Sequence, residues 1–162
     1  MVYSFDNKDE IVKKHISMEI LLNLLLGRSS NLYQELYNEQ TIYGSPSLDY
    51  EFGKTYAHVL ITGQSKDPDK VYAKFKEEVR KMKENGINKE NFNRIKKMIY
   101  GNYVKEYNDV QDIARMFLAD YFKGINSFEY LEEIEGINEE YVNQVLNSVF
   151  KEEKMILSVV RN

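Results

Sequence analysis

His15 and His58 are the two histidines of this 162-residue chain, and they limit the hydrolytic chemistry that it can support. Zinc hydrolysis needs three protein ligands at fixed geometry, usually including two histidines close together on a helix. Glu19 follows His15 by four residues and would share its helix face, but one histidine and one carboxylate are too few ligands. The inverted zinc motif His-x-x-Glu-His is absent from the sequence. We therefore predict no metal site, no catalytic residue and no cofactor in this chain.

Serine and cysteine offer no alternative nucleophile. The chain has no cysteine, which excludes thiol catalysis, thiolate zinc sites and disulfides, and which favours a cytoplasmic location. Ser45 lies between Gly44 and Pro46, where turn chemistry accounts for it, and the sequence contains no Gly-x-Ser-x-Gly elbow. The sequence thus predicts that the chain is not an enzyme on its own.

Tyrosine is the chemically distinctive residue of this chain. There are 13 tyrosines, more than a core requires, and amphipathic aromatic side chains are favoured at recognition surfaces. Tyr33, Tyr37, Tyr43 and Tyr50 cluster around the start of a predicted hairpin. We expect Tyr33 in the core, whereas Tyr37 and Tyr43 are candidates for contact with a peptide.

Charge and hydropathy exclude two classes of partner. The 22 Lys and Arg residues against 26 Asp and Glu residues give a net charge of −4, which argues against nucleic acid. The longest apolar run, residues 20–26, is interrupted by Asn23 and is far shorter than the ~20 residues of a membrane span. With 43% hydrophobic residues, the chain has the length and composition of one folded domain.

The first elements are two helices. Apolar residues fall on almost every side of residues 11–26, which predicts a helix packed on several faces, with Asp6 or Asn7 as its N-cap and Gly27 at its end. A second, short helix is expected to open at Ser29 or Ser30.

A hairpin and further helices follow. Leu48, Tyr50 and Phe52 alternate with polar residues, and residues 56–62 resume after Gly53, which predicts an antiparallel hairpin. Apolar residues at helical spacing then predict helices around residues 71–82, 92–103, 110–121, 128–134 and 142–150. Residues 155–160 are rich in β-formers and are expected to join the same sheet, as is a short strand at 2–5. These elements predict an α+β fold, with a small antiparallel sheet packed against several helices.

Residues 24–36, Leu-Leu-Leu-Gly-Arg-Ser-Ser-Asn-Leu-Tyr-Gln-Glu-Leu, resemble a signature of the pitrilysin/insulinase family of zinc peptidases. In that family, which includes the mitochondrial processing peptidases, a buried helix ends in Gly, a Ser-Ser pair caps the next helix, and Leu-Tyr-x-x-Leu follows. Residues 88–107 and 138–160 look like the end of the same domain. The resemblance covers most of the chain and implies a metallohydrolase-like domain of the processing-peptidase type.

Members of this family are built from repeated α+β domains that close like a clamshell around a peptide, with the zinc motif in the first domain only. The resemblance implies that residues 1–162 form a single, non-catalytic C-terminal domain, a fragment of a longer chain. Zinc would then bind only in an upstream domain of a parent metalloendopeptidase. The implied partners are other domains of that chain or a paralogous subunit, together with peptide substrate.

The resemblance also bears on Tyr37 and Tyr43. In active members, an Arg directly after the last Leu of the signature and a Tyr seven residues beyond it help to hold the substrate backbone. Here Tyr37 occupies the Arg position and Tyr43 comes six residues later, so the pair is not reproduced. The departure fits best the YmfH-like subgroup of bacterial members, which look like Leu-Tyr-x-Glu at this point.

Three functions remain open from the sequence. The first is part of a peptide-enclosing chamber wall with interdomain contacts, without catalysis. The second is a free-standing binding or assembly module that uses the tyrosine-rich hairpin surface. The third is an unrelated hydrolase whose missing ligands come from a second chain.

Overall fold

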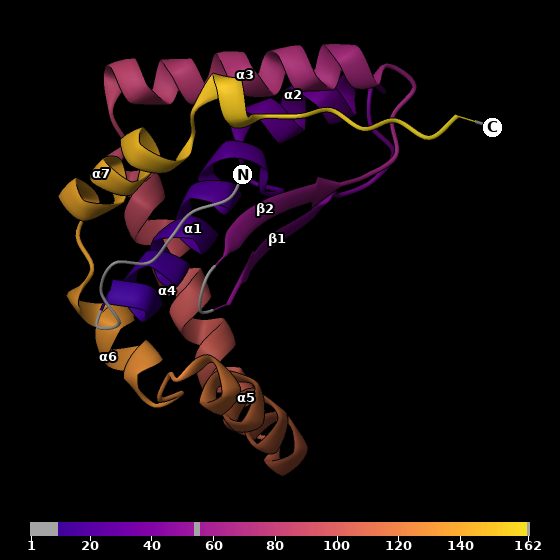
Figure 1. Cartoon of the computed structure of the whole chain (residues 1–162). Coiled ribbons are helices and arrows are strands. Elements are labelled where there is room, and N and C mark those ends of the chain that lie inside the picture. The colour runs from indigo at the N-terminus through magenta and orange to yellow at the C-terminus, as the bar shows by residue number, and fades with distance from the viewer. Residues whose placement is uncertain (1–9, 54–55, 162) are drawn as a thin grey trace.

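A computed structural model of the chain describes residues 10–53 and 56–161. In chain order its elements are α1 (Ile11–Leu26), α2 (Asn31–Asn38), β1 (Ser47–Phe52), β2 (Ala57–Thr62), α3 (Pro68–Asn85), α4 (Lys89–Glu106), α5 (Val110–Lys123), α6 (Glu129–Gly136), α7 (Glu139–Val149) and the short 3-10 helix η2 (Glu152–Lys154) (Figure 1). The helices pack on one face of a single antiparallel hairpin, so the predicted α+β class is confirmed.

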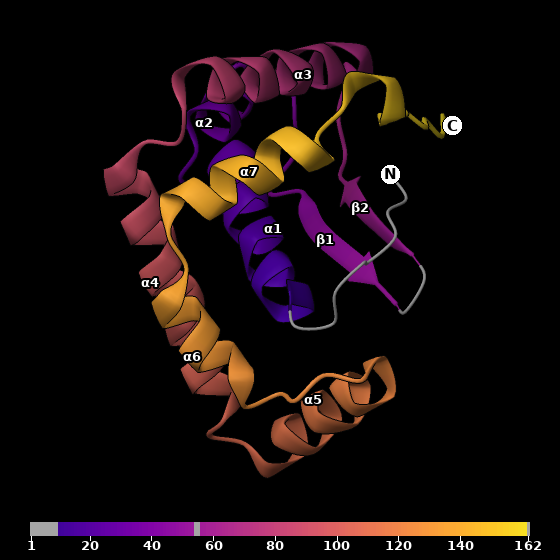
Figure 2. The ribbon, with the colours of Figure 1, turned by 60° about the vertical axis from the view of Figure 1, so that its left-hand side comes forward.

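Helix α1 is the centre of the molecule. It contacts α2, α3, α4, α6, α7 and β1, and Figures 1 and 2 show it running through the middle of the fold. Ile16, Leu21 and Leu25 are completely buried, as expected for a helix that is apolar on every side. The predicted N-caps, Asp6 and Asn7, lie outside the described residues. Neither α1 nor any other helix of the described residues is long and apolar enough to cross a membrane.

Local capping chemistry sets the predicted helix ends. Helix α1 ends at Gly27, the predicted residue. A Cβ added at this position would lie 2.5 Å from the Asn23 carbonyl oxygen. Of the two serines predicted to open α2, Ser30 is the N-cap, because its hydroxyl accepts a hydrogen bond from the Tyr33 N–H at 3.1 Å. Helix α3 ends at Gly86, whose φ of 75° is one that a side chain disfavours.

The hairpin forms in the register that the alternation predicts. Leu48 pairs with Ile61, Tyr50 with Val59 and Phe52 with Ala57, so one face of both strands turns towards the helices. Phe52 and Ala57 are buried and pack with Ile11 at the start of α1. The hairpin is thus attached along α1.

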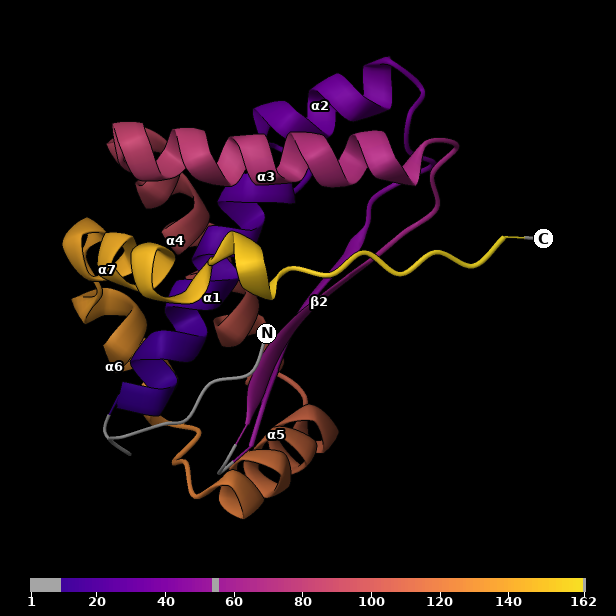
Figure 3. The same cartoon turned by 45° about the horizontal axis from the view of Figure 1, so that its top comes forward.

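The predicted strand at 155–160 is wrong: in the described residues the sheet contains only β1 and β2. The segment is extended, and Figures 1 and 3 show it running beside α3. The Tyr72 hydroxyl donates a 2.9 Å hydrogen bond to the Met155 carbonyl, and Arg161 lies 3.9 Å from Asp69. β-forming residues favour an extended backbone, but a strand also needs a neighbour, and here side chains of α3 hold the segment instead. The strand predicted at 2–5 lies outside the described residues.

Helix α5 forms where the spacing predicts it but does not bury its apolar face. Val110, Phe117 and Tyr121 are 81%, 45% and 65% exposed, and Asp120 is the buried residue of this helix. Figure 2 shows α5 standing apart from the layer formed by α1, α4 and α6. Helical spacing therefore predicted the element correctly, whereas burial depends on neighbours that the described residues do not provide.

Candidate functional site

Tyr37 and Tyr43, the predicted peptide contacts, lie on either side of the turn that leads from α2 into the hairpin. They are 52% and 60% exposed. The Tyr37 ring stacks on Tyr33, with ring centroids 5.7 Å apart and planes inclined by 16°. Tyr33 is buried, as predicted. Both candidate rings are open to a partner, but the ring contact of Tyr37 is with Tyr33 and not with Tyr43.

The backbone between the two tyrosines is held by its own hydrogen bonds. Gln40 has a φ of 54°, which reverses the chain after α2. The Thr41 N–H then donates to the Leu36 carbonyl at 2.8 Å, and the Tyr43 N–H donates to the Gln64 carbonyl at 3.0 Å. Tyr43 is consequently fixed against the segment that follows β2, at the open end of the hairpin.

An ion-pair network ties α2 to α3 beside Tyr37. Glu39 Oε2 lies 3.0 Å from Lys70 Nζ and 3.2 Å from Lys74 Nζ, and Lys74 also contacts the Glu35 carboxylate. Hydrogen bonds from Lys70 and Lys74 hold the pKa of Glu39 below its ordinary value. The pair with Glu35 raises the pKa of Lys74. Lys70 and Lys74 are each already paired with a carboxylate of this network. They therefore offer little electrostatic attraction to the carboxylate of a peptide.

The chemistry available at this surface is recognition and not catalysis. A phenol stacks against apolar or planar groups, and its hydroxyl provides one donor and no charge. His58 belongs to β2, where it pairs with Glu51 across the hairpin and its ring stacks on Tyr56. In residues 10–53 and 56–161, no three His, Asp or Glu side chains come together in a group that could hold a metal ion.

Two open depressions lie on the helices. One, of about 350 Å³, is lined by α4 and α6 residues that include Lys96, Tyr100 and Glu135. The other, of about 380 Å³, is lined by residues that include Tyr107 and Phe128. Neither of these two depressions is lined by Tyr37 or Tyr43.

A partly buried polar contact joins His15 to a helix that is distant in sequence. His15 Nδ1 lies 2.8 Å from the Tyr130 hydroxyl of α6, and the imidazole ring also contacts the rings of Tyr50 and Phe52. Burial, with a smaller contribution from the charge of Lys123, lowers the pKa of His15 to about 3. The imidazole is therefore neutral at physiological pH and is surrounded by aromatic groups.

Glu19 lies one turn further along α1 in a similar environment. Its Oε2 atom is shielded from solvent and has no hydrogen-bond partner among the residues that the structure describes. Burial, and then the negative charge of Glu106, raises the pKa of Glu19 to about 7, although a hydrogen bond with Tyr103 acts in the opposite direction. A partly buried carboxyl with this pKa holds a proton in a large fraction of molecules at neutral pH.

The spacing of His15 and Glu19 correctly predicted that they share one helix face. Their partners could not be predicted, because Tyr103 and Tyr130 come from α4 and α6 and carry no local signal in the sequence. The outcome is a partly buried polar cluster of one imidazole, one carboxyl and two phenol side chains.

These features define a class of protein domain: helices packed on an antiparallel hairpin, an exposed pair of tyrosines and, within the described residues, no group of side chains that could hold a metal ion. The family model described as the Peptidase M16 inactive domain matches residues 2–99. The chain belongs to this family. The resemblance to the pitrilysin/insulinase peptidases is thereby confirmed, as is the assignment of the chain to a domain type that does not itself carry the active site.

Individual relatives support the same assignment. The chain is 25% identical over 151 residues to the uncharacterized zinc protease YmfH of Bacillus subtilis strain 168, covering 93% of this chain and 35% of YmfH. An M16-like peptidase from Alicyclobacillus acidocaldarius shares the fold with a TM-score of 0.80 at 21% identity, over 85% of this chain and 33% of that one. A protease from Helicobacter pylori does so with a TM-score of 0.73 at 16% identity, over 93% and 37%. The chain thus spans about a third of the length of these relatives.

Proposed function

We propose that this chain is the C-terminal, non-catalytic domain of a larger zinc peptidase, in which it forms part of a peptide-enclosing wall and contacts the other domains. The observation that carries the proposal is the match to the inactive-domain family over residues 2–99. The fold shared with about a third of an M16-like peptidase supports it, since such a peptidase contains two further thirds of chain.

The proposal assigns catalysis and this chain's non-catalytic role to different domains of the protein. Zinc and the catalytic groups would belong to an upstream domain, because the sequence lacks the His-x-x-Glu-His motif. Residues 1–162 would act as one domain of that chain or beside a paralogous subunit. A cytoplasmic location stays a prediction from the absence of cysteine.

Tyr37 and Tyr43 are the proposed peptide contacts. Their exposed rings lie at the open end of the hairpin, beside a charge network that is internally paired. A peptide would therefore be held by stacking and main-chain hydrogen bonds, with little dependence on salt. The isolated domain supplies one wall of the chamber, so most of the contact area is missing while the entropic cost of association remains. Weak binding follows.

The peptide contact is tested by titrating unstructured peptides onto the isolated chain while following backbone chemical shifts. We expect weak binding with shifts around Tyr37 and Tyr43, further weakening in Tyr37→Ala and Tyr43→Ala, and no cleavage with or without zinc. Tyr56→Ala is the matched control, because Tyr56 is 47% exposed at the other end of the hairpin. Submicromolar binding by wild type, abolished by either change, would favour the free-standing binding module instead.

Inspection of the coding sequence upstream of this chain tests whether it belongs to a larger peptidase. We expect an upstream coding region, in the same frame or in a neighbouring gene, that carries His-x-x-Glu-His or a degraded remnant of it. A locus without such a region would contradict the chamber-wall proposal. It would not change the assignment of the chain to its family, which rests on the family match.

A further inference from the structure

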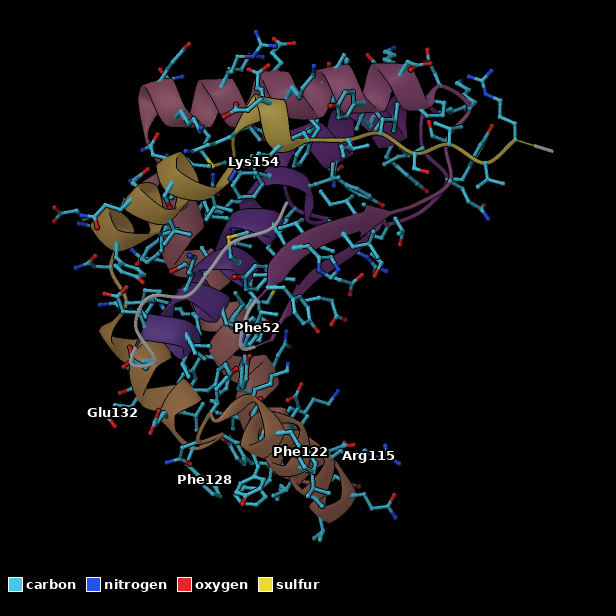
Figure 4. All side chains as sticks on the ribbon, in the orientation of Figure 1. Phe52, Arg115, Phe122, Phe128, Glu132 and Lys154 are labelled. Atoms are coloured by element: carbon cyan, nitrogen blue, oxygen red, sulfur yellow. The ribbon has the colours of Figure 1, made fainter. Side chains whose placement is uncertain are left out.

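Helix α5 presents an apolar face that no other described element covers. Five of its large apolar side chains are between 45% and 81% exposed: Val110, Phe117, Leu118, Tyr121 and Phe122. Figures 1 and 2 show this helix projecting from the body of the molecule, and Figure 4 shows Phe122 on it. An apolar face of this kind on an isolated helix marks an interaction surface.

The opposite side of α5 contacts the rest of the domain, so the apolar face points away from the domain. Ser127 Oγ donates a 2.8 Å hydrogen bond to Asp120 Oδ2, and both residues are buried. Lys123 Nζ lies 4.3 Å from the centre of the Phe52 ring of β1. At its start, Asp109 caps the helix by accepting hydrogen bonds from two backbone N–H groups.

The spacing within the apolar face is that of a helix-pairing seam. Val110, Ala114, Phe117 and Tyr121 follow one another at intervals of four, three and four residues. This 4-3-4 spacing places the four side chains in one row along the helix, as in the a and d positions of a coiled coil. Ala114 is exposed like its neighbours in the row.

The row is complementary to a second copy of itself in antiparallel orientation. Pairing about its midpoint sets Ala114 against Phe117 of the second copy and Val110 against Tyr121 of the second copy. Each contact then joins a small side chain to a large aromatic one, and a two-fold axis repeats both contacts. A parallel arrangement would instead set Phe117 and Tyr121 each against its own counterpart.

Charge does not oppose this pairing, although each chain carries a net charge of −4. The row itself contains no charged residue, and the residues that flank it on its open side are Gln111 and Leu118. Asp112 and Arg115 lie off the row and 3.7 Å from each other. Two copies can therefore approach without burying like charges.

We propose that this chain self-associates through α5, which pairs antiparallel with α5 of a second copy along Val110, Ala114, Phe117 and Tyr121. The proposal is independent of the peptidase assignment, since it rests on the surface of α5 alone. A helix of 14 residues is about 20 Å long. A contact along one helix of this length is smaller than the ~800 Å² per partner of a standard interface, so we expect weak, reversible association.

Sedimentation equilibrium of the isolated chain from low to high micromolar concentration tests the proposal. We expect the mass of wild type to rise from 19.2 kDa towards twice that value. Phe117→Glu and Tyr121→Glu should each weaken association at least tenfold without loss of helix signal, because each places an unpaired charge against an apolar side chain of the second copy. Val160→Glu, which changes a side chain that is 93% exposed on the C-terminal segment, should have no effect. A wild type that stays monomeric throughout, or association that survives both α5 changes, would overturn the proposal.

The orientation is tested by disulfide trapping, because the natural chain has no cysteine. A mixture of Val110→Cys and Tyr121→Cys chains should oxidise mainly to the mixed dimer, since antiparallel pairing brings these two positions together. Predominance of the two homodimers would show parallel pairing and contradict the proposed geometry.

Discussion

His15 Nδ1 lies 2.8 Å from the Tyr130 hydroxyl, and this contact links α1 to α6 across 115 residues of sequence. Tyr130 is 2% exposed and its ring stacks on that of Tyr103 of α4, with centroids 5.0 Å apart. One aromatic side chain thus contacts two other helices and satisfies a polar atom in the interior. The central helix is held in place by this polar contact as well as by apolar packing.

Removing that hydroxyl should destabilise the domain. Tyr130→Phe leaves the imidazole nitrogen of His15 without its partner, and an unsatisfied buried polar group costs about 1–3 kcal/mol. We expect the free energy of unfolding, measured in urea, to fall by that amount. Tyr121→Phe is the matched control, since this hydroxyl belongs to a side chain that is 65% exposed. Equal stability of the two variants would show that the contact contributes nothing.

Glu19 should make the stability of the domain depend on pH. Its pKa is raised from 4.5 to about 7 by burial and then by Glu106, so the folded state binds the proton more tightly than the unfolded state does. The contribution of Glu19 to the free energy of unfolding therefore falls as the pH rises from about 4.5 to about 7, and it levels off above that range. His15 acts in the opposite sense below pH 6.5, because its pKa is lowered to about 3.

Comparing Glu19→Gln with wild type isolates the contribution of Glu19. Glutamine resembles the protonated carboxyl, so the two proteins should differ least near pH 4, and at pH 8 the variant should be more stable by up to about 3 kcal/mol. Urea unfolding at several pH values measures the difference, with the exposed Glu84→Gln as control. A difference that does not change with pH would mean that the Glu19 carboxyl is solvated.

Leu25→Ala should create a cavity in the core. Leu25 is fully buried at the centre of the fold, and Leu-to-Ala changes at such sites cost about 2–5 kcal/mol. The midpoint of denaturant unfolding should fall accordingly, whereas Leu60→Ala, at a residue that is 48% exposed on β2, should change it little. An unchanged midpoint for Leu25→Ala would contradict the central position of α1.

The isolated chain should hold no stoichiometric zinc. His15 is occupied by its contact with Tyr130, and His58 pairs with Glu51 on a separate element. Elemental analysis after chelator treatment, re-addition of zinc and exhaustive dialysis measures the bound metal. One tightly held zinc per chain would refute the non-catalytic assignment and would favour a hydrolase with a metal site of its own.

The sequence by itself determined the features that depend on neighbours along the chain. Caps such as Gly27 and Ser30 act through hydrogen bonds and backbone angles within a few residues, so their patterns predicted where helices begin and end. The alternation of Leu48, Tyr50 and Phe52 likewise determined which face of the hairpin packs on the helices. The family signature at residues 24–36 is equally local, since it runs from the end of α1 through the cap at Ser30 into α2.

The tertiary structure alone decided which of these elements find partners. Residues 155–160 have the composition of a strand but lie along α3, because strand pairing depends on what lies beside a segment and not on its own propensity. The periodic face of α5 predicted a helix, yet it is exposed because the described residues provide no element to cover it. The partners of His15 and Glu19 come from helices distant in sequence, and packing of those helices around α1 brings the groups together.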